Sequence, residues 1–276
     1  MSHQLYRLLD SVYNTPHLVT EAALVPIVDY LQARNSAGFS LVPGAETAEM
    51  KKAATLGKLG EIEIDGVLTY KPVMGACGPE GVSYTSILSQ AAELIEQGCD
   101  TILLTHSSPG GQAAHCFSTA LELKQMTEDA GVKLISYIDT MSASASLALG
   151  IVADEVIIHP SASTGSIGCV VALMDRSKAM ANAGLKPIYI SSTPGKTPFE
   201  TDGSFSESFL EEIQEDVTRL GREFAQHVSA HTRIDVETIL NMDAKMYHAQ
   251  AALDAGLVNK IMDHKQLAEY LNILPV

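Results

Sequence analysis

TILLTHSSPGG, residues 101–111, is the stretch on which the fold prediction depends. It begins with apolar and β-branched residues that predict a short buried strand at residues 101–105. The SSPGG that follows at residues 107–111 predicts a turn, because Pro and Gly interrupt regular structure. Helical patterns flank the strand at residues 86–98 and 113–130. A strand between two helices is the repeating unit of a parallel α/β sheet.

The same alternation continues outward in both directions. Upstream, alternating apolar residues predict a strand at residues 59–68. Downstream, the pattern predicts strands at 133–137, 155–158 and 187–191, a short helix at 144–153 and a long helix at 209–228. Repeated strand–helix units imply an α/β fold with a mainly parallel sheet and right-handed crossovers.

The part of the chain before this pattern has a different character. Residues 1–35 carry apolar side chains at three- and four-residue spacing and are expected to be helical. Residues 36–57 are small, polar and Gly/Pro-containing, which is typical of a linker. We therefore expect a helical extension with its linker at 1–57 and one domain at 58–276.

Composition limits the function classes. With 276 residues, 46% of them hydrophobic, the chain can bury a sizeable core. Its formal charge of −15 argues against nucleic acid as the principal partner, since phosphate binding needs clustered Lys and Arg. We expect no membrane partner, because neither a signal peptide nor a long apolar stretch is found. The cysteines are scattered without metal-ligand spacing, so no metal or cofactor is expected.

Three clusters of small residues follow predicted strands, where parallel sheets place their sites. In the first, Gly110 and Gly111 free backbone N–H groups to point at an anion or a developing oxyanion. In the second, SASAS at residues 142–146, Ser144 stands at the start of a short helix, which would expose its hydroxyl. The third is TGSIG at residues 164–168. Taken singly, each cluster also fits an ordinary turn or helix cap.

The order of the clusters carries more information than any one of them. SPGG, then a small-residue serine helix ending in AD, then TGSIG, resembles the family of signal peptide peptidase A. The resemblance runs from about Leu59 to Ile261 and includes IDGV at 64–67 and AQAALDAGLVNKI at 249–261. It implies a ClpP/crotonase-like fold and a serine endopeptidase that works through a Ser-Lys dyad.

Matched position by position, the resemblance implies the roles of the site residues. Ser144 is the nucleophile and Lys196 its general base. Gly110, Gly111 and Ala145 belong to the oxyanion site, where the Gly111 N–H and the N–H of Ser144 or its neighbour donate, and Ser166 orients the lysine. A lysine ordinarily titrates near 10.4, and its pKa must fall toward 7 for it to act as a base. We therefore expect Lys196 to be desolvated and held by hydroxyls rather than by an acid.

Other interpretations stay open beside this one. The family usually has Gly-Gly after the nucleophile, where this chain has Ala145 and Ser146. This departure also fits a structural capsid or scaffold-binding protein that keeps a decayed peptidase fold. A ClpP-type Ser-His-Asp triad, with His159 as the base, is a further alternative.

The resemblance also suggests a biological setting. A short N-terminal extension in place of a membrane span resembles the phage branch, the prohead or capsid-assembly proteases, which act in the host cytoplasm inside the immature capsid. The implied substrates are scaffold, portal or capsid proteins, and the protease itself; a host cytosolic peptidase is the alternative. Relatives form homo-oligomeric rings, in some of which a neighbouring protomer completes the site. The small residues near Ser144 suggest a pocket that prefers Ala, Ser or Gly before the cut.

Overall fold

The computed structural model describes residues 16–20, 54–56, 58–72, 74–75, 78–79 and 82–272. Its main sheet has the strand order β13-β12-β10-β8-β3-β2; β11 also pairs with β10, and β14 pairs with β11. The strands are β2 (Ala54–Leu56), β3 (Leu59–Asp65), β8 (Thr101–Ser108), β10 (Lys133–Ala143), β11 (Glu155–Ile158), β12 (Ser163–Gly165), β13 (Met246–His248) and β14 (Lys260–Ile261). The pairs at its centre are parallel, which confirms the predicted fold class.

Helices cover both faces of this sheet. The helices are α3 (Tyr84–Glu96), α4 (Cys116–Ala130), α5 (Ala145–Gly150), α6 (Ser177–Asn182), α7 (Glu207–His231), α8 (Val236–Leu240), α9 (Ala249–Asp254) and α10 (His264–Tyr270). Alternate residues of β8 face opposite sides, as a strand requires. Ile102 and Leu104 join the main core with α3, α4 and α5, whereas Leu103 joins a second cluster with Leu267 of α10. The sheet is therefore buried on both faces, as is typical of parallel sheets.

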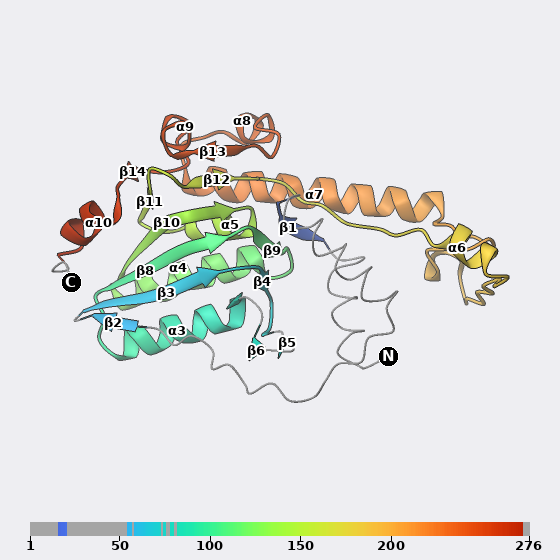
Figure 1. Cartoon of the computed structure of the whole chain (residues 1–276), viewed down its shortest axis with the longest axis horizontal. Coiled ribbons are helices and arrows are strands. Elements are labelled where there is room, and N and C mark those ends of the chain that lie inside the picture. The colour runs from blue at the N-terminus through green and yellow to red at the C-terminus, as the bar shows by residue number, and fades with distance from the viewer. Residues whose placement is uncertain are drawn as a thin grey trace.

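A smaller sheet lies at the end of β8, with the order β1-β9-β4-β7. Its strands are β1 (His17–Val19), β9 (Gly110–Gln112), β4 (Leu68–Thr69) and β7 (Val82–Ser83). Figure 1 shows β1 beside β9, although the two are far apart in the sequence. The backbones approach closely here, since a Cβ on Gly111 would lie 1.9 Å from the carbonyl oxygen of Leu68. Only glycine fits at this position. A separate short pair joins β5 (Met74–Gly75) to β6 (Gly78–Pro79).

The sequence-based predictions were wrong in four places. The predicted turn at 107–111 is instead the end of β8 followed by β9. Residues 17–19 form a strand rather than part of a helix, because they pair with β9; the rest of the expected extension lies outside the described residues. Residues 54–56 of the expected linker pair with β3. The strand expected at 187–191 does not form, because no neighbouring strand pairs with this segment in the described chain.

Residues 177–206, which we call the arm, lie beyond the start of α7 and away from the main sheet (Figure 1). The arm contains α6 and the short 3-10 turn η1 (Pro194–Lys196). A row of stacked rings joins it to α7, with centroids 5.1–5.5 Å apart: Tyr189, Phe199, Phe205 and Phe209. Beyond this row, Ile188 and Ile190 are 80% and 95% exposed. Large apolar side chains exposed together mark an interaction surface.

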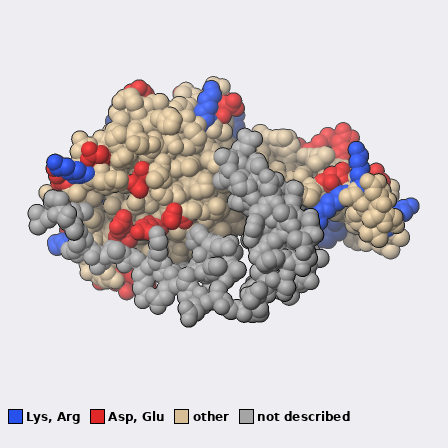
Figure 2. Space-filling view, in the orientation of Figure 1, with Lys and Arg blue, Asp and Glu red and all other residues tan. Residues whose placement is uncertain are grey.

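The charged side chains are dispersed. On the face in Figure 2, Asp and Glu are spread over the body and the arm, with Lys and Arg standing beside them. This distribution agrees with an acidic, well-solvated surface. Among the helices that the structure describes, none is both long and apolar enough to cross a membrane.

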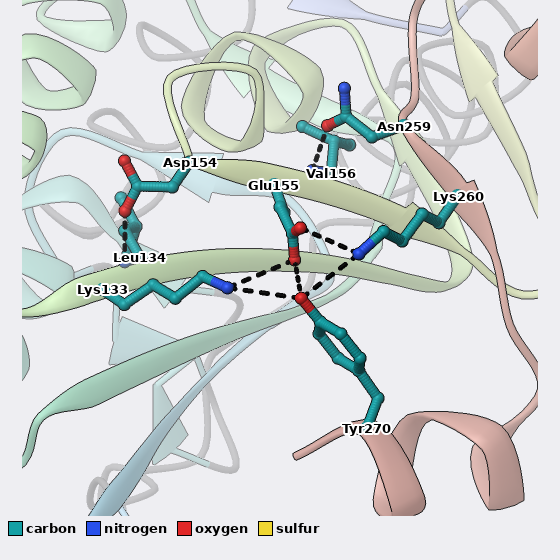
Figure 3. Close-up of polar contacts among 8 residues, drawn as sticks. All are labelled: Lys133, Leu134, Asp154, Glu155, Val156, Asn259, Lys260 and Tyr270. Atoms are coloured by element: carbon teal, nitrogen blue, oxygen red, sulfur yellow. Dashed lines mark hydrogen bonds and ion pairs between the residues drawn. The ribbon is translucent and has the colours of Figure 1, made fainter.

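A polar cluster fixes the C-terminal helix α10 to the sheet (Figure 3). Tyr270 Oη donates to Glu155 Oε2 at 2.5 Å and accepts hydrogen bonds from Lys260 and Lys133. Lys260 Nζ lies 2.8 Å from Glu155 Oε1 and 4.3 Å from the centroid of the Tyr270 ring. Burial alone would raise the pKa of Glu155, but the bonds from Lys260 and Tyr270 outweigh it and lower that pKa. Glu155 is thus held as the carboxylate.

Replacing Tyr270 with phenylalanine should destabilise the protein by about 1–2 kcal/mol, because Glu155 and both lysines lose a shared partner. The free energy of unfolding in urea would measure the effect. Lys265→Ala on the same helix is the matched control. Its pair with Glu269 spans 4.0 Å between highly exposed side chains, so the change should stay below about 0.5 kcal/mol. Equal effects in the two variants would show that the cluster does not anchor α10.

Candidate active site

Ser144 lies in the turn between β10 and α5. Its backbone has φ 54° and ψ −117°, a conformation that costs a residue with a side chain about 1–3 kcal/mol. The N–H of Ser144 donates to the carbonyl of Gly165 at 2.9 Å, and Ala148 N–H donates to the carbonyl of Ser144 at 3.0 Å. Ala143 and Ala145 on either side are fully buried, so only small side chains fit there. A strained strand-to-helix turn of this kind is how several hydrolases present a nucleophile.

The hydroxyl of Ser144 is buried but lacks a hydrogen bond to any residue that the structure describes. Within the described residues its Oγ has no hydrogen-bond partner, and the residue is 0% exposed. Buried polar atoms are almost always hydrogen-bonded, because leaving one unpaired costs about 1–3 kcal/mol. An unpaired hydroxyl on a strained turn is a feature that stability alone does not explain.

The backbone amides around this turn narrow the possible oxyanion donors. The Ser144 N–H is already bonded to Gly165, which leaves the first amide of α5, that of Ala145. The Gly110 N–H donates to Ser108 Oγ at 3.2 Å, and Gly111 is paired with Leu18 of β1. A Cβ on Gly110 would lie 3.0 Å from the carbonyl oxygen of Ala143, so β9 runs directly beside the turn. Gly110, the neighbour of Gly111, thus lies close to the residue that precedes Ser144.

The structure explains the unusual Ser146. Its Oγ lies 2.8 Å from Nδ1 of His106 and 3.0 Å from Oγ of Ser142, and all three side chains are buried. Ser146 therefore points into the protein, toward His106 of β8 and Ser142 of β10. Thr164 Oγ1 donates to the carbonyl of Ser142 at 2.6 Å and ties β12 to the same place.

His106 is a residue whose role the sequence did not reveal. It lies within β8, next to the SPGG residues, and is 0% exposed. Burial lowers its pKa to about 3, so the ring is neutral at neutral pH. It bonds Ser146 rather than Ser144 and so acts as a structural link between β8 and α5. A hydroxyl two residues after Ser144 was the one signal that could have suggested a buried partner.

The structure does not bring Lys196 to Ser144. Lys196 is exposed in η1 on the arm, and Ser144 Oγ has no hydrogen-bond partner in the described part of the chain. The expected burial of Lys196 is therefore absent from the single chain. Ser166, expected to orient the lysine, follows β12 with a left-handed backbone at φ 55° and is 8% exposed. Its N–H donates to the carbonyl of Lys245 at 3.0 Å, so the residue is firmly placed near the turn.

His159, the alternative base, belongs to a different cluster. Its ring stacks on His264 with centroids 4.8 Å apart, and its Nδ1 accepts from the N–H of Ser161. His264 in turn bonds Asp139 at 2.6 Å. This histidine–aspartate set does not reach the hydroxyl of Ser144. Over the described residues, no His, Cys, Asp and Glu side chains gather in a group that could hold a metal ion.

A serine on a strained strand-to-helix turn, in a mainly parallel α/β fold and beside a glycine strand, is an arrangement that serine hydrolases also use. The chain belongs to peptidase family S49, whose sequence profile matches residues 126–274, more than half of its length. This membership confirms the resemblance to signal peptide peptidase A enzymes on which the site prediction was built.

Similar proteins include two from phages. Capsid assembly protease C of Escherichia phage lambda is 28% identical over 193 residues, which cover 70% of this chain and 43% of that protein. Head-tail preconnector protein GP5 of Enterobacteria phage P21 is 24% identical over 197 residues, covering 70% and 37%. Probable protease SohB of Haemophilus influenzae is 25% identical over 193 residues, covering 68% and 54%. The resemblance to the phage branch is confirmed, although the chain spans only about half or less of these relatives.

Proposed function

We propose that the chain is a serine endopeptidase in which Ser144 attacks the peptide carbonyl. The observation that carries the proposal is the unpaired, buried hydroxyl of Ser144 on its strained turn. Strain and an unsatisfied polar atom both reduce stability, and proteins retain them where a reacting group must be held in place. Membership of a peptidase family supplies the reaction class.

The chemistry follows from the groups around the turn. A base takes the proton from Ser144 Oγ, which attacks the carbonyl carbon and forms a tetrahedral intermediate. The N–H groups of Gly111 and Ala145 bind the negatively charged oxygen of that intermediate. The C–N bond breaks as the amine leaves with a proton from the base, and an acyl-enzyme forms. Water, activated by the same base, then releases the acid.

The base in this proposal is Lys196 of a neighbouring protomer. The single chain presents Lys196 on an arm that lies away from its own sheet, beside the exposed Ile188 and Ile190. Docking of this apolar arm surface on a second copy would bury the isoleucines and bring the lysine into a drier environment. Desolvation lowers the pKa of a lysine, which a base for serine requires. Ser166, next to the turn, would hold the incoming amine.

The substrates in this proposal are scaffold, portal or capsid proteins during phage head maturation, and the protease itself. The names of two relatives, a capsid assembly protease and a head-tail preconnector protein, support this setting. The named relative SohB is a probable protease of a bacterium and supports the alternative of a host peptidase.

Trapping the acyl-enzyme tests the proposal. Incubation with an acylating peptide ester should add the acyl mass to the tryptic peptide that contains Ser144, and the same enzyme should cleave a capsid or scaffold protein. His159→Ala should keep both properties, because its ring is bonded to a separate cluster. Loss of both in His159→Ala, with Lys196→Ala still active, would favour a ClpP-type triad. If wild type neither cleaves nor is labelled, the fold serves a structural role in capsid assembly.

A further inference from the structure

The strand β1 lies against the part of the molecule where a substrate would bind. It pairs antiparallel with β9, and the register places Leu18 opposite Gly111 and Val19 opposite Gly110. The Thr20 N–H donates to the carbonyl of Pro109 at 3.1 Å, and Ala113 N–H donates to the carbonyl of Pro16 at 3.2 Å. The segment Pro16–Thr20 thus covers the outer edge of β9, the strand that carries the proposed oxyanion donor.

The other edge of β1 is also engaged. His17 and Val170 exchange both backbone hydrogen bonds, each at 2.9 Å, as an isolated antiparallel bridge. Val170 lies two residues beyond the end of the TGSIG cluster that contains Ser166. The segment is therefore held between β9 on one side and the chain beyond Ser166 on the other. Extended peptides bind to exposed strand edges in the same way, through backbone hydrogen bonds.

The register brings a peptide carbonyl of this segment to the reactive turn. A Cβ on Gly110 would lie 2.1 Å from the carbonyl oxygen of Leu18 and 3.0 Å from that of Ala143. The Leu18 carbonyl is thus next to Gly110 and to the residue that precedes Ser144. Leu18 itself is 0% exposed, and its neighbours His17 and Val19 are nearly as buried.

We infer that the cleft between β9 and Val170 is the binding site for an extended polypeptide, and that Pro16–Thr20 occupies it as an internal competitor of substrate. The inference rests on the proposed peptidase function and adds the substrate's conformation, direction and register to it. A substrate would pair antiparallel with β9, and the residue before the cut would take the position of Leu18. This occupant indicates a position that accepts a leucine-sized side chain, rather than the Ala, Ser or Gly expected from the sequence.

With the segment in this place, Ser144 is completely buried. A nucleophile that no solvent reaches cannot meet a substrate from solution. Residues 16–20 must leave before another polypeptide can pair with β9, since a strand edge accepts one neighbour at a time. The basal activity of the chain is thus set by how often the segment is released.

Two experiments test the inference: peptide binding, and a disulfide that reversibly locks β1 onto β9. A fluorescent peptide TPHLVTE, the sequence around Leu18, would be titrated into the Ser144→Ala protein with and without Leu18→Asp. The buried charge should release β1, so the double variant should bind the peptide at least about tenfold more tightly. A peptide with Asp in place of that Leu should bind neither protein. Equal affinity of TPHLVTE for both proteins would overturn the inference.

The lock does not depend on how well Leu18→Asp folds. His17 and Gln112 face each other in the β1–β9 register, so His17→Cys with Gln112→Cys can form a disulfide across the pair. The oxidised protein should neither bind the peptide nor cleave a capsid or scaffold protein, and a reductant should restore both. The single variant Gln112→Cys, treated with the same oxidant, controls for the loss of glutamine and for the native cysteines. An oxidised double variant that cleaves as well as the reduced one would show that the segment is only structural.

The two readouts separate the inference from the function on which it rests. Peptide binding that depends on Leu18 and on the lock, in a protein that neither cleaves nor is acylated, would support the cleft and refute the peptidase proposal. Cleavage that depends on Ser144 but is indifferent to Leu18 and to the lock would refute the cleft and leave the peptidase. A cut in wild type between Leu18 and Val19 would support the proposed register.

Discussion

Replacing Ser144 with alanine is expected to abolish peptide cleavage while making the protein more stable. Removal of the nucleophile of a serine hydrolase lowers kcat/KM by at least about 10⁴-fold. The same change deletes a buried hydroxyl that has no partner within the described structure, so the free energy of unfolding should rise by about 1 kcal/mol. Cleavage kinetics and urea unfolding on one preparation measure both effects.

The neighbouring Ser146 provides a matched control with the opposite signature. Ser146→Ala removes a hydroxyl that bonds His106 at 2.8 Å and Ser142 at 3.0 Å, and leaves the buried His106 Nδ1 with only the longer contact to Ser142 Oγ at 3.4 Å. It should lower the free energy of unfolding by about 1–3 kcal/mol and keep the protein active. If Ser146→Ala abolished cleavage and Ser144→Ala did not, the nucleophile would be misassigned. Since both serines lie in one SASAS run, this pair separates the catalytic from the structural hydroxyl.

The sequence alone predicted the fold class and the family, because the patterns that identify them lie in short contiguous stretches. Strand and helix periods, with small residues after the strands, are written into contiguous stretches such as TILLT at 101–105. The order of SPGG, the serine helix and TGSIG then identified the family that the profile match confirms. Ser144 remains a prediction as the nucleophile, but the strained turn is where such a residue is expected.

What the sequence did not reveal depends on contacts between distant segments. Residues 17–19 lie in a region with helical spacing, yet they form a strand because β9, more than ninety positions away by register, offers an open edge. His106 and Ser146 are forty positions apart, and no sequence pattern around either residue predicts their hydrogen bond. Residues 187–191 have the composition of a strand, but a strand needs a partner, and the described chain provides none.

That unpartnered segment leads to the second large effect, which concerns Lys196. Lys196→Ala is expected to lower kcat/KM by at least about 10³-fold, because an unassisted serine hydroxyl is a poor nucleophile. Lys196→Arg should be equally inactive, since a guanidinium keeps its proton and cannot act as a base. Lys178→Ala, a second exposed lysine on the arm, is the control and should remain fully active. An active Lys196→Ala protein would remove this residue from the mechanism.

Mixing two inactive variants then decides where the lysine comes from. If the arm of one protomer serves the Ser144 of the next, Ser144→Ala and Lys196→Ala protomers assembled together will form some sites with both residues intact. Random assembly in a ring with head-to-tail contacts would restore about one quarter of wild-type activity. Pairing within one chain would restore none, because every protomer then lacks one of the two groups. The control mixture, Lys196→Ala with the double variant, contains no lysine at the site and should stay inactive in either case. Since Lys196 is exposed on an arm that carries Ile188 and Ile190 outward, we expect the mixed assembly to regain activity.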